Sequence, residues 1–503
     1  MSKYIISLDE GTTSCRTLVI NKKGEVVASD ALEFSQIFPK AGWVEHDAVE
    51  IWNSQRTTLV QSVNKAKIKP EDILGIGITN QRETVVMWDK RSGLPIYNAI
   101  VWQDRRTAKY CDELIAQGKS ELVQAKTGLV INPYFSATKI KWILDNVDGA
   151  RELANDNNLL FGTIDTWLIY RLTGGKTHIT DSTNASRTML FNIHTKEWDD
   201  ELLTLLDIPK GILPTVKSSS EVYGHTFPGL LSKDTDIQIP IASAIGDQQA
   251  ALFGQLCLEP GEVKNTYGTG CFILMNTGQT PIKSNNGLLT TIALDYKGTT
   301  TYALEGSVFV AGAAVQWLRD QIKIIYHASE TDWYTNLVKD DQQVYVVPSF
   351  TGLGSPYWDS YSRGAIFGLE RGTKREHLVK ATLESLAYQS YDVITAMAED
   401  LKKPIKRIKV DGGASRNEYL MQFQADITQV EVIRPKSIET TALGAAFLAG
   451  LAVGFWTSRD EIKQILMVDK TYKAKLDQAI VHKLLKGWKV AVNRTLNWLK
   501  DIE

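Results

Sequence analysis

The chain has 503 residues, of which 43% are hydrophobic and 23% charged, as is usual for globular proteins. Lysine and arginine (56) nearly balance aspartate and glutamate (58), so we expect no nucleic-acid partner, which would need a basic face. The four cysteines lie far apart, which indicates neither a disulfide framework nor a zinc site and favours a reducing, cytoplasmic location.

The N-terminal segment predicts a small antiparallel sheet. Tyr4–Ser7 and Leu18–Asn21 are rich in β-branched and aromatic residues, and the Gly-containing stretch between them is typical of a hairpin turn. Val26–Phe34 predicts a third strand in the same sheet.

Asp47–Lys65 predicts a helix that starts with a capping box of Asp47 and Glu50. Ile73–Thr79 and Thr84–Trp88 then return to the alternation expected of strands. Three later segments are predicted to be mostly helical: Asn132–Val147, Phe161–Leu172 and Asp199–Asp207.

The second half of the chain opens like the first. Val263–Tyr267 and Cys271–Asn276 flank the turn Gly268-Thr269-Gly270, and this order of strand, turn and strand indicates an internal duplication. We therefore expect an α/β protein of two domains, residues 1–253 and 254–503, each with such a hairpin.

Three further segments of the second half carry predictions. Ile408–Val410 is expected to be a strand that ends at Asp411-Gly412-Gly413 and leads into a helix over Asn417–Ile427. Ala442–Trp456 is shorter than the roughly 20 residues that span a bilayer, so we expect a buried core helix and no membrane insertion. The basic amphipathic stretch Val481–Lys500 is expected to dock on its own domain, with a membrane or protein contact as the alternative.

The two Gly/Thr turns have the composition of phosphate-binding loops. Gly11 lets the backbone turn tightly, and hydroxyl and N–H groups of residues 12–14 can surround phosphate oxygens, with Arg16 within reach. Asp9, at the end of a buried strand, has the donor chemistry for Mg²⁺. One such hairpin alone is most often only a turn, but two of them and an Asp-Gly-Gly turn together predict one ATP site.

Nine segments, spread over the chain from about residue 4 to residue 456, carry a family resemblance: Gly42–Asp47, Gly77–Thr84, Asn98–Gln103, Asn132–Phe135, Gly162–Trp167, Thr183–Thr188, Gly246–Gly254, Asn265–Gly270 and Thr440–Ala446. In these segments the chain resembles the FGGY family of carbohydrate kinases, which shares the actin/Hsp70/hexokinase ATPase fold. The resemblance implies two actin-like (ribonuclease H-like) α/β domains with ATP in the cleft between them.

Within the family, the resemblance is to members that phosphorylate glycerol, and it implies a role for each matching residue. Asp247 would be the catalytic base that accepts the proton of the attacking hydroxyl. The implied glycerol pocket consists of Arg82, Glu83, Trp102, Tyr134, Asp247, Gln248 and Phe272. The implied nucleotide contacts are Thr12, Thr13, Ser14, Arg16, Thr269, Gly312, Gln316, Gly413 and Asn417. Charged and amide groups suit the hydroxyls of a triol, and aromatic faces suit its C–H surface.

Each of these residues also has a purely structural interpretation. Arg82 and Glu83 could form a surface ion pair, Tyr134 could pack in a turn, and Trp102 could belong to a core. Asp247 could cap a helix over residues 248–254. Their joint occurrence in the matching segments favours the functional interpretation.

The implied reaction is Mg²⁺-dependent transfer of the γ-phosphoryl group of ATP to glycerol, which gives sn-glycerol 3-phosphate and ADP and serves glycerol uptake and catabolism. We also expect a cytoplasmic homo-oligomer, either a dimer or a tetramer. Two rivals stay open: a kinase for another polyol or a pentulose, and an ATPase of the same fold that polymerises or clamps a protein.

Two departures from the family pattern concern charge and regulation. Glu10 stands where bacterial relatives usually have glutamine, which adds a carboxyl near the expected phosphate site and leaves open whether Mg²⁺ or ATP binding changes. The loop Gly224–Pro240 has no arginine and only one histidine, His225, so regulation by fructose 1,6-bisphosphate or by histidine phosphorylation is an open question.

Overall fold

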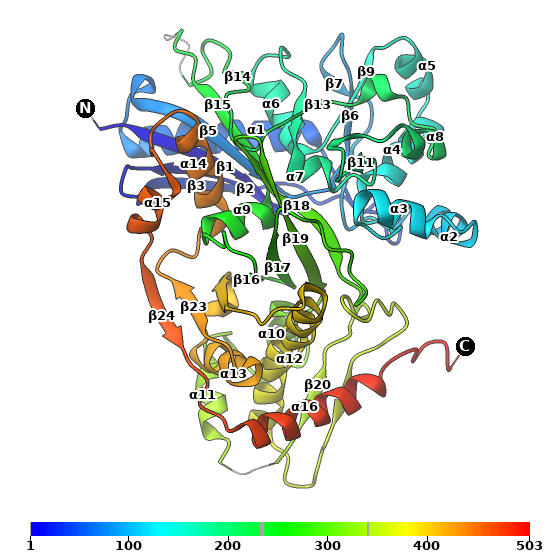
Figure 1. The fold of residues 1–503 in the computed structure, drawn as a ribbon, viewed down its shortest axis with the longest axis vertical. Helices are drawn as coiled ribbons and strands as arrows, with labels where there is room; N and C mark the ends of the chain where they lie inside the picture. Colours follow the sequence, from blue (N-terminus) through cyan, green and yellow to red (C-terminus); the bar gives the residue numbers. More distant parts are fainter. Residues whose placement is uncertain (1, 232–235, 340–341, 503) are drawn as a thin grey trace.

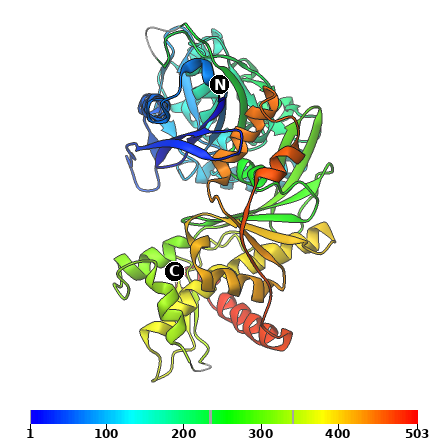
Figure 2. The ribbon, with the colours of Figure 1, turned by 90° about the vertical axis from the view of Figure 1, so that its left-hand side faces the viewer.

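The computed structural model describes residues 2–231, 236–339 and 342–502, and its two halves are each built around a β-sheet (Figures 1 and 2). The strands of the first sheet are β1 (Tyr4–Glu10), β2 (Ser14–Ile20), β3 (Val26–Glu33), β5 (Ile73–Asn80), β14 (Gly224–His225) and β15 (Pro240–Gly246). The strands of the second sheet are β16 (Glu262–Tyr267), β17 (Cys271–Gly278), β18 (Leu289–Tyr296), β19 (Thr299–Val308), β22 (Arg407–Asp411), β23 (Val432–Pro435) and β24 (Val468–Tyr472).

The two sheets place five corresponding strands in the same spatial order, which agrees with the predicted internal duplication. In the first sheet β1, β2 and β3 form an antiparallel meander, and β5 and then β15 add parallel to β1. In the second sheet β16, β17 and β19 occupy the corresponding antiparallel positions, although the chain first forms the edge strand β18 between β17 and β19. β22 and then β23 add parallel to β16. The carboxyl ends of the parallel strands therefore meet at one edge of each sheet, where open α/β sheets bind their ligands.

The helices surround these sheets and are α1 (Ala48–Ala66), α2 (Ala108–Ala116), α3 (Ser120–Thr127), α4 (Ser136–Asn146), α5 (Ala150–Asn155), α6 (Ile164–Leu172), α7 (Ser182–Ala185), α8 (Asp200–Leu205), α9 (Asp247–Gly254), α10 (Gly312–Asp320), α11 (Glu330–Leu337), α12 (Arg375–Leu401), α13 (Glu418–Thr428), α14 (Thr440–Ala452), α15 (Arg459–Ile465) and α16 (Gln478–Asn493). Short 3-10 helices occupy Pro70–Asp72, Lys210–Ile212 and Gly413–Arg416. The remaining strands are β4 (Glu45–His46), β6 (Val86–Asp89), β7 (Leu94–Pro95), β8 (Ala99–Ile100), β9 (Leu159–Gly162), β10 (Ile179–Asp181), β11 (Phe191–Asn192), β12 (Glu197–Trp198), β13 (Thr215–Lys217), β20 (Tyr345–Val347) and β21 (Ala365–Phe367).

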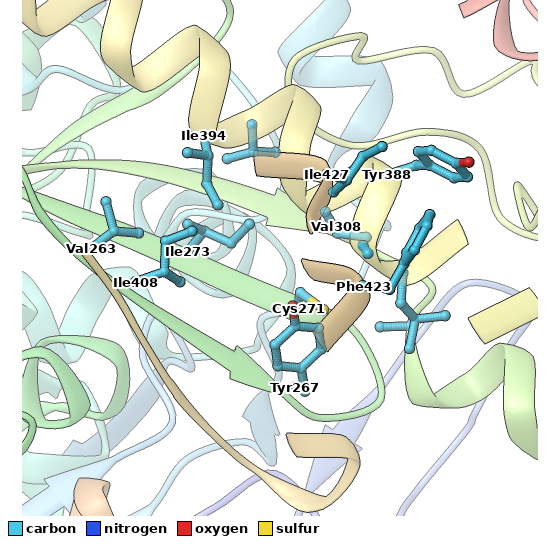
Figure 3. Close-up of a cluster of buried hydrophobic side chains, with 14 of the residues drawn as sticks. Val263, Tyr267, Cys271, Ile273, Val308, Tyr388, Ile394, Ile408, Phe423 and Ile427 are labelled. Carbon is cyan, nitrogen blue, oxygen red and sulfur yellow. The ribbon is translucent and has the colours of Figure 1, made fainter. Parts of the chain in front are cut away.

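The core of the second half lies between its sheet and two long helices. Val263, Ile273 and Ile408 project from neighbouring strands of the sheet, and Ile394 of α12 and Ile427 of α13 pack in the same cluster (Figure 3). All five side chains are buried, so this core fixes α13 relative to the carboxyl ends of β16 and β22.

Helix α14 belongs to the second half by sequence but packs on the sheet of the first half. It contacts β1, β5, β15 and α9, and Figures 1 and 2 show it in orange beside the blue strands. The side chains of Ala442–Leu451 are buried, which confirms the predicted core helix. Among the described residues, no helix is long and apolar enough to cross a membrane.

The crossing of α9 and α14 depends on two glycines. A Cβ atom on Gly444 would overlap the carbonyl oxygen of Ala250, and a Cβ atom on Gly254 would overlap that of Thr440. The backbones of the two helices therefore touch directly, and only glycine fits at either position.

Several predicted helices differ from the structure at their ends. The helix predicted over Asn132–Val147 begins only at Ser136, because the Asn132 side chain accepts a hydrogen bond from the Tyr134 N–H at 2.9 Å and forms a turn. Residues 161 and 162 belong to β9, which pairs with β6, so the helix predicted from Phe161 begins at Ile164.

The start of α1 and the end of α16 also differ from the predictions. Asp47 caps α1 by accepting from the Val49 N–H at 2.8 Å, but Glu50 does not complete a capping box and instead accepts from Ser35 at 3.0 Å. Helix α16 ends at Asn493 rather than near Lys500, and its buried Trp488 docks it on the second half as expected. The four cysteines are free and buried.

We predict that Gly444→Ala lowers the free energy of unfolding by about 1–3 kcal/mol, because the new methyl group meets a backbone carbonyl that cannot rotate away. Denaturant unfolding measures the change. Gly372→Ala is the matched control, since a Cβ atom there meets nothing within 4 Å. Equal stability of the two variants would contradict the close crossing of α9 and α14.

Candidate active site

Polar side chains gather where the parallel strands of the first sheet end, at the carboxyl ends of β1, β5 and β15. Asp9 and Glu10 end β1, the turn Gln81-Arg82-Glu83 follows β5, and Asp247 follows β15 as the first residue of α9. Three segments far apart in the sequence therefore meet because the sheet is parallel here.

Arg82 lies at the centre of this group. Its Nε is 3.2 Å from Oδ1 of Asp247, and its Nη2 donates to the Tyr134 hydroxyl at 3.3 Å. Its Nη1 and Nη2 also donate to the two carboxylate oxygens of Glu305 on β19, at 2.6 and 2.8 Å. The Arg82 side chain is 2% exposed and that of Asp247 30%, so the guanidinium is fixed while the aspartate can meet a substrate.

A second buried arginine completes a network of alternating charge. Arg187 donates from Nε to Glu83 at 2.6 Å and from Nη2 to Glu305 at 3.1 Å, and Glu83 lies 3.8 Å from Arg82. All four side chains are buried, which corrects the alternative of a surface pair formed by Arg82 and Glu83.

The sequence analysis missed Glu305 and Arg187. Glu305 is a lone carboxylate in the largely apolar stretch of β19, and Arg187 lies in a segment that matches the family but carried no assigned role. A charged residue inside an apolar strand is the signal that points to Glu305, because such a residue needs a buried partner.

Burial and the two arginines shift the pKa of Glu305 in opposite directions. Burial alone would raise the pKa of Glu305, but Arg187 and Arg82 outweigh it and hold the pKa at about 2. Burial raises the pKa of the Tyr134 hydroxyl, so tyrosine remains protonated and can donate a hydrogen bond. Glu305 is therefore ionised throughout the physiological range.

Three half-buried aromatic side chains line one side of this group. The Trp102 ring is 5.6 Å from the Tyr134 ring and 6.2 Å from the Phe272 ring between centroids, and both pairs are nearly perpendicular. The indole Nε1 of Trp102 donates to Oγ1 of Thr12 at 2.9 Å and thereby joins the aromatic group to the first hairpin turn.

Asp247 is held by its neighbour Gln248. Its Oδ1 accepts from the Gln248 backbone N–H at 2.7 Å, and its Oδ2 accepts from the Gln248 side-chain Nε2 at 2.9 Å. Because α9 begins at Asp247 and Gly246 is its N-cap, the alternative of an Asp247 cap is wrong. The residues predicted to bind glycerol thus form one connected cluster: Arg82, Glu83, Trp102, Tyr134, Asp247, Gln248 and Phe272.

The first hairpin turn is closed by a hydrogen bond from the Gly11 N–H to the Ser14 carbonyl at 2.9 Å, and Thr13 is exposed at its tip. Arg16 bonds Asp9 at 3.1 Å and also contacts Glu439 at 2.7 Å. Burial raises the pKa of Asp9 against the lowering effect of Arg16, and nearby Glu439 and Asp247 raise it further.

Glu10 is directed into the protein rather than toward the turn. Its side chain is fully buried, its Oε1 accepts from Gln81 at 3.1 Å, and its Oε2 has no hydrogen-bond partner. Burial raises the pKa of Glu10 well above its usual range, which favours the neutral acid.

The second hairpin turn lies against the start of α10. The Gly312 N–H donates to the Gly268 carbonyl at 3.0 Å and the Ala311 N–H to the Thr269 carbonyl at 2.8 Å. A Cβ atom on Gly312 would lie 2.6 Å from that Gly268 oxygen, so glycine is required for this approach. Thr269 and Gly312 are thus neighbours, as a shared nucleotide site requires.

The remaining residues that are predicted to bind the nucleotide lie on different elements of the second half. Gly413 is exposed in the turn after β22, and Gln316 is exposed on α10. Asn417 is the N-cap of α13, where its Oδ1 accepts from the Leu420 N–H at 2.7 Å and its Nδ2 donates to Thr331 at 3.0 Å. The structure gives Asn417 a capping role, and its nucleotide contact stays a prediction.

Two sheets with five strands in the same spatial order, and with charged and hydroxyl side chains at the carboxyl ends of their strands, define a two-domain kinase of the actin-like ATPase fold. Residues 4–254 match the N-terminal domain of the FGGY family of carbohydrate kinases, and residues 263–453 match the C-terminal domain. The chain therefore belongs to the FGGY family of carbohydrate kinases and is an ATP-dependent phosphotransferase.

Relatives with established names cover the whole chain. It is 63% identical to a glycerol kinase of Mycoplasma capricolum over 100% of the chain and 99% of that protein. It is 58% identical to a glycerol kinase of Clostridium botulinum over 99% of each. The crystal structure of Plasmodium falciparum glycerol kinase with ADP has a TM-score of 0.92 at 37% identity over 98% of each chain. A gluconate kinase of Lactobacillus acidophilus (TM-score 0.90, 23% identity, 100% of each chain) shares the fold.

We predict that Glu305→Gln destabilises the protein by about 3–5 kcal/mol at neutral pH, because it leaves two buried guanidinium groups short of negative charge. The folded-state pKa of Glu305 is depressed from 4.5 to about 2, so this stabilisation is complete above about pH 4.5 and is lost as the pH falls toward 2.

Urea unfolding of both proteins at several pH values between 7 and 3 measures this difference. Glu384→Gln is the control, because Glu384 is also buried but has a pKa that burial raises. A difference between wild type and Glu305→Gln that does not shrink below pH 4.5 would contradict the assignment.

Proposed function

We propose that the protein is a glycerol kinase that transfers the γ-phosphoryl group of ATP to glycerol and releases sn-glycerol 3-phosphate and ADP. The observation that carries the proposal is the accessible Asp247 carboxylate, held between the fixed Arg82 guanidinium and the Gln248 amide beside an aromatic wall. The names of the relatives that cover the whole chain support the choice of glycerol.

In this mechanism Asp247 accepts the proton of the attacking hydroxyl group of glycerol. Gln248 and Arg82 occupy defined positions on its two oxygens, so the carboxylate needs no reorganisation before the reaction. The hydroxyls of glycerol would bond to Arg82 and Glu83, and its C–H surface would lie on Trp102 and Phe272. Enclosure of the substrates excludes water, which would otherwise take the phosphoryl group.

The nucleotide would lie along the two hairpin turns. We propose phosphate contacts from Thr12, Thr13, Ser14, Arg16 and Thr269, and adenosine contacts from Gly312, Gln316, Gly413 and Asn417. The adjacency of Thr269 and Gly312 supports this arrangement.

The site has the donor chemistry for Mg²⁺ at Asp9. Burial, Glu439 and Asp247 all raise the pKa of Asp9, so a divalent cation would stabilise its ionised form. Within the described ranges no group of three or more His, Cys, Asp or Glu side chains could hold a metal, so phosphates and water would supply most ligands. When bound, Mg²⁺ neutralises charge on the transferring phosphate.

Two further proposals concern the domain division and the oligomeric state of the protein. We propose a division into an N-terminal domain, residues 1–253, and a C-terminal domain, residues 254–503, with α14 as an element that crosses between them. We also propose a homo-oligomer, dimer or tetramer. In the loop Gly224–Pro240, where regulation is an open question, His225 is exposed and residues 232–235 lie outside the described part.

We predict that Asp247→Asn lowers the turnover number by about 10²–10⁴-fold, because asparagine cannot accept the proton. ADP release from Mg-ATP in the presence of glycerol measures the effect. Asp200→Asn is the control, since this exposed aspartate begins α8 far from the site. Turnover of Asp247→Asn close to that of wild type would rule out Asp247 as the base.

We predict that wild-type protein releases ADP from Mg-ATP rapidly only when glycerol is added, with glycerol 3-phosphate as product. A panel of xylulose, ribulose, gluconate and erythritol tests the rival kinase activities, and light scattering with ATP tests for a polymerising ATPase. ADP release that is indifferent to glycerol would overturn the proposed substrate.

A further inference from the structure

Lys264 is a fully buried lysine one contact away from the proposed catalytic base. It lies in the middle of β16, and its side chain is 0% exposed. Its Nζ donates to Oε1 of Gln248 and to Oγ1 of Thr266, the latter at 3.0 Å. Gln248 in turn donates from Nε2 to Asp247 at 2.9 Å, so a chain of two hydrogen bonds joins Lys264 to the base.

The chemistry of the end groups determines the direction of this chain. A lysine ammonium has only donors, so the Gln248 atom that faces Lys264 must be the carbonyl oxygen. An ionised carboxylate has only acceptors, so the Gln248 atom that faces Asp247 must be the NH₂ group. Lys264 reinforces the orientation that Asp247 also favours, because the flipped amide would direct its oxygen at the carboxylate and its NH₂ group at the ammonium.

We propose that Lys264 is a positioning residue for phosphoryl transfer, which locks the Gln248 amide so that its NH₂ group holds the Asp247 carboxylate toward the substrate. The inference rests on the proposed function. Because Lys264 is fully buried behind Gln248, it acts through that amide and does not touch glycerol.

The electrostatics of the surroundings agree with a charged donor. Burial lowers the pKa of Lys264 to about 8, and Asp411 and Asp247 counteract that effect. The side chain is therefore mainly cationic at neutral pH. A donor that carries charge forms a stronger hydrogen bond to the Gln248 oxygen than a neutral one would.

A purely structural role is the competing explanation, and the neighbouring strand offers a matched control for it. Lys409 on β22 is the direct strand partner of Lys264, so both side chains leave the same face of the sheet. Lys409 donates to the carbonyl oxygens of Gln255 and Leu256, at 2.8 and 2.9 Å, at the far end of α9. It thus serves the same helix without contact to the base.

The test compares Lys264→Met, Gln248→Leu, the double variant and Lys409→Met. We expect Lys264→Met to lower kcat by about 10–100-fold, because misorientation of a reacting group costs that order of rate, with KM for Mg-ATP changed less than about twofold. In the Gln248→Leu background the same substitution should lower kcat by less than about twofold, since its route to Asp247 is already cut. Lys409→Met should lower the melting temperature and leave kcat near wild type.

Equal factors for Lys264→Met in both backgrounds, or a wild-type kcat for Lys264→Met, would overturn the proposal. If Lys264→Met does not fold, Gln248→Glu replaces it as the test, because a glutamate still accepts from Lys264 but cannot donate to Asp247. The proposal then requires a kcat at least as low as that of Gln248→Leu, and a wild-type value would overturn it. Absence of glycerol-dependent ADP release in wild type would overturn the proposed function as well, whereas an active wild type isolates the role of Lys264.

Discussion

The bidentate ion pair between Arg82 and Glu305 is the interaction on which the site depends. Arg82 follows a strand of the first sheet and Glu305 lies on a strand of the second, so one contact joins the halves at the reaction centre. Burial of these charges is favourable only when every partner is in place, since a lone buried guanidinium or carboxylate is costly. Arg187 and Glu83 supply further partners of opposite charge in the same network.

This rigid network leaves few groups free to react. The arginines and glutamates are buried and paired with one another, although Nη1 of Arg187 has no hydrogen-bond partner among the described residues, while Asp247 retains an accessible edge. A carboxylate that is oriented from behind by an amide and flanked by a fixed cation is preorganised for proton transfer. In the proposed mechanism the aromatic side chains add shape without competing for protons, so substrate choice and proton transfer would be carried by different residues.

Much of this arrangement follows from local sequence patterns. The two hairpins and the apolar helix expected within Ala442–Trp456 each rest on spacing within a few residues. The structure confirms both hairpins and the buried helix, which spans Thr440–Ala452. The members of the glycerol cluster came from motifs of a family resemblance, and the structure brings them into contact. Helix ends were less predictable, because the turn at Asn132 and the pairing of β9 compete with helix formation.

Glu305, Arg187 and Lys264 escaped sequence reasoning for a physical reason. Arg82 and Glu305 are 223 residues apart, and nothing within β19 shows which cation will face that carboxylate. Lys264 stands between Val263 and Asn265 in a strand, where a lysine ordinarily indicates a solvent-facing position. Their roles arise from the docking of two sheets, which local periodicity does not encode.

The passage of α14 onto the first sheet has a consequence for how the protein is made. β1, β5 and β15 are complete once Gly246 is synthesised, but the helix that covers one face of them ends at Ala452. At a rate of synthesis of roughly 5–20 residues per second, that face of the sheet stays uncovered by α14 for on the order of 10–40 s. The nascent N-terminal half therefore exposes apolar surface during most of the synthesis of the C-terminal half, and its final folding is a late event.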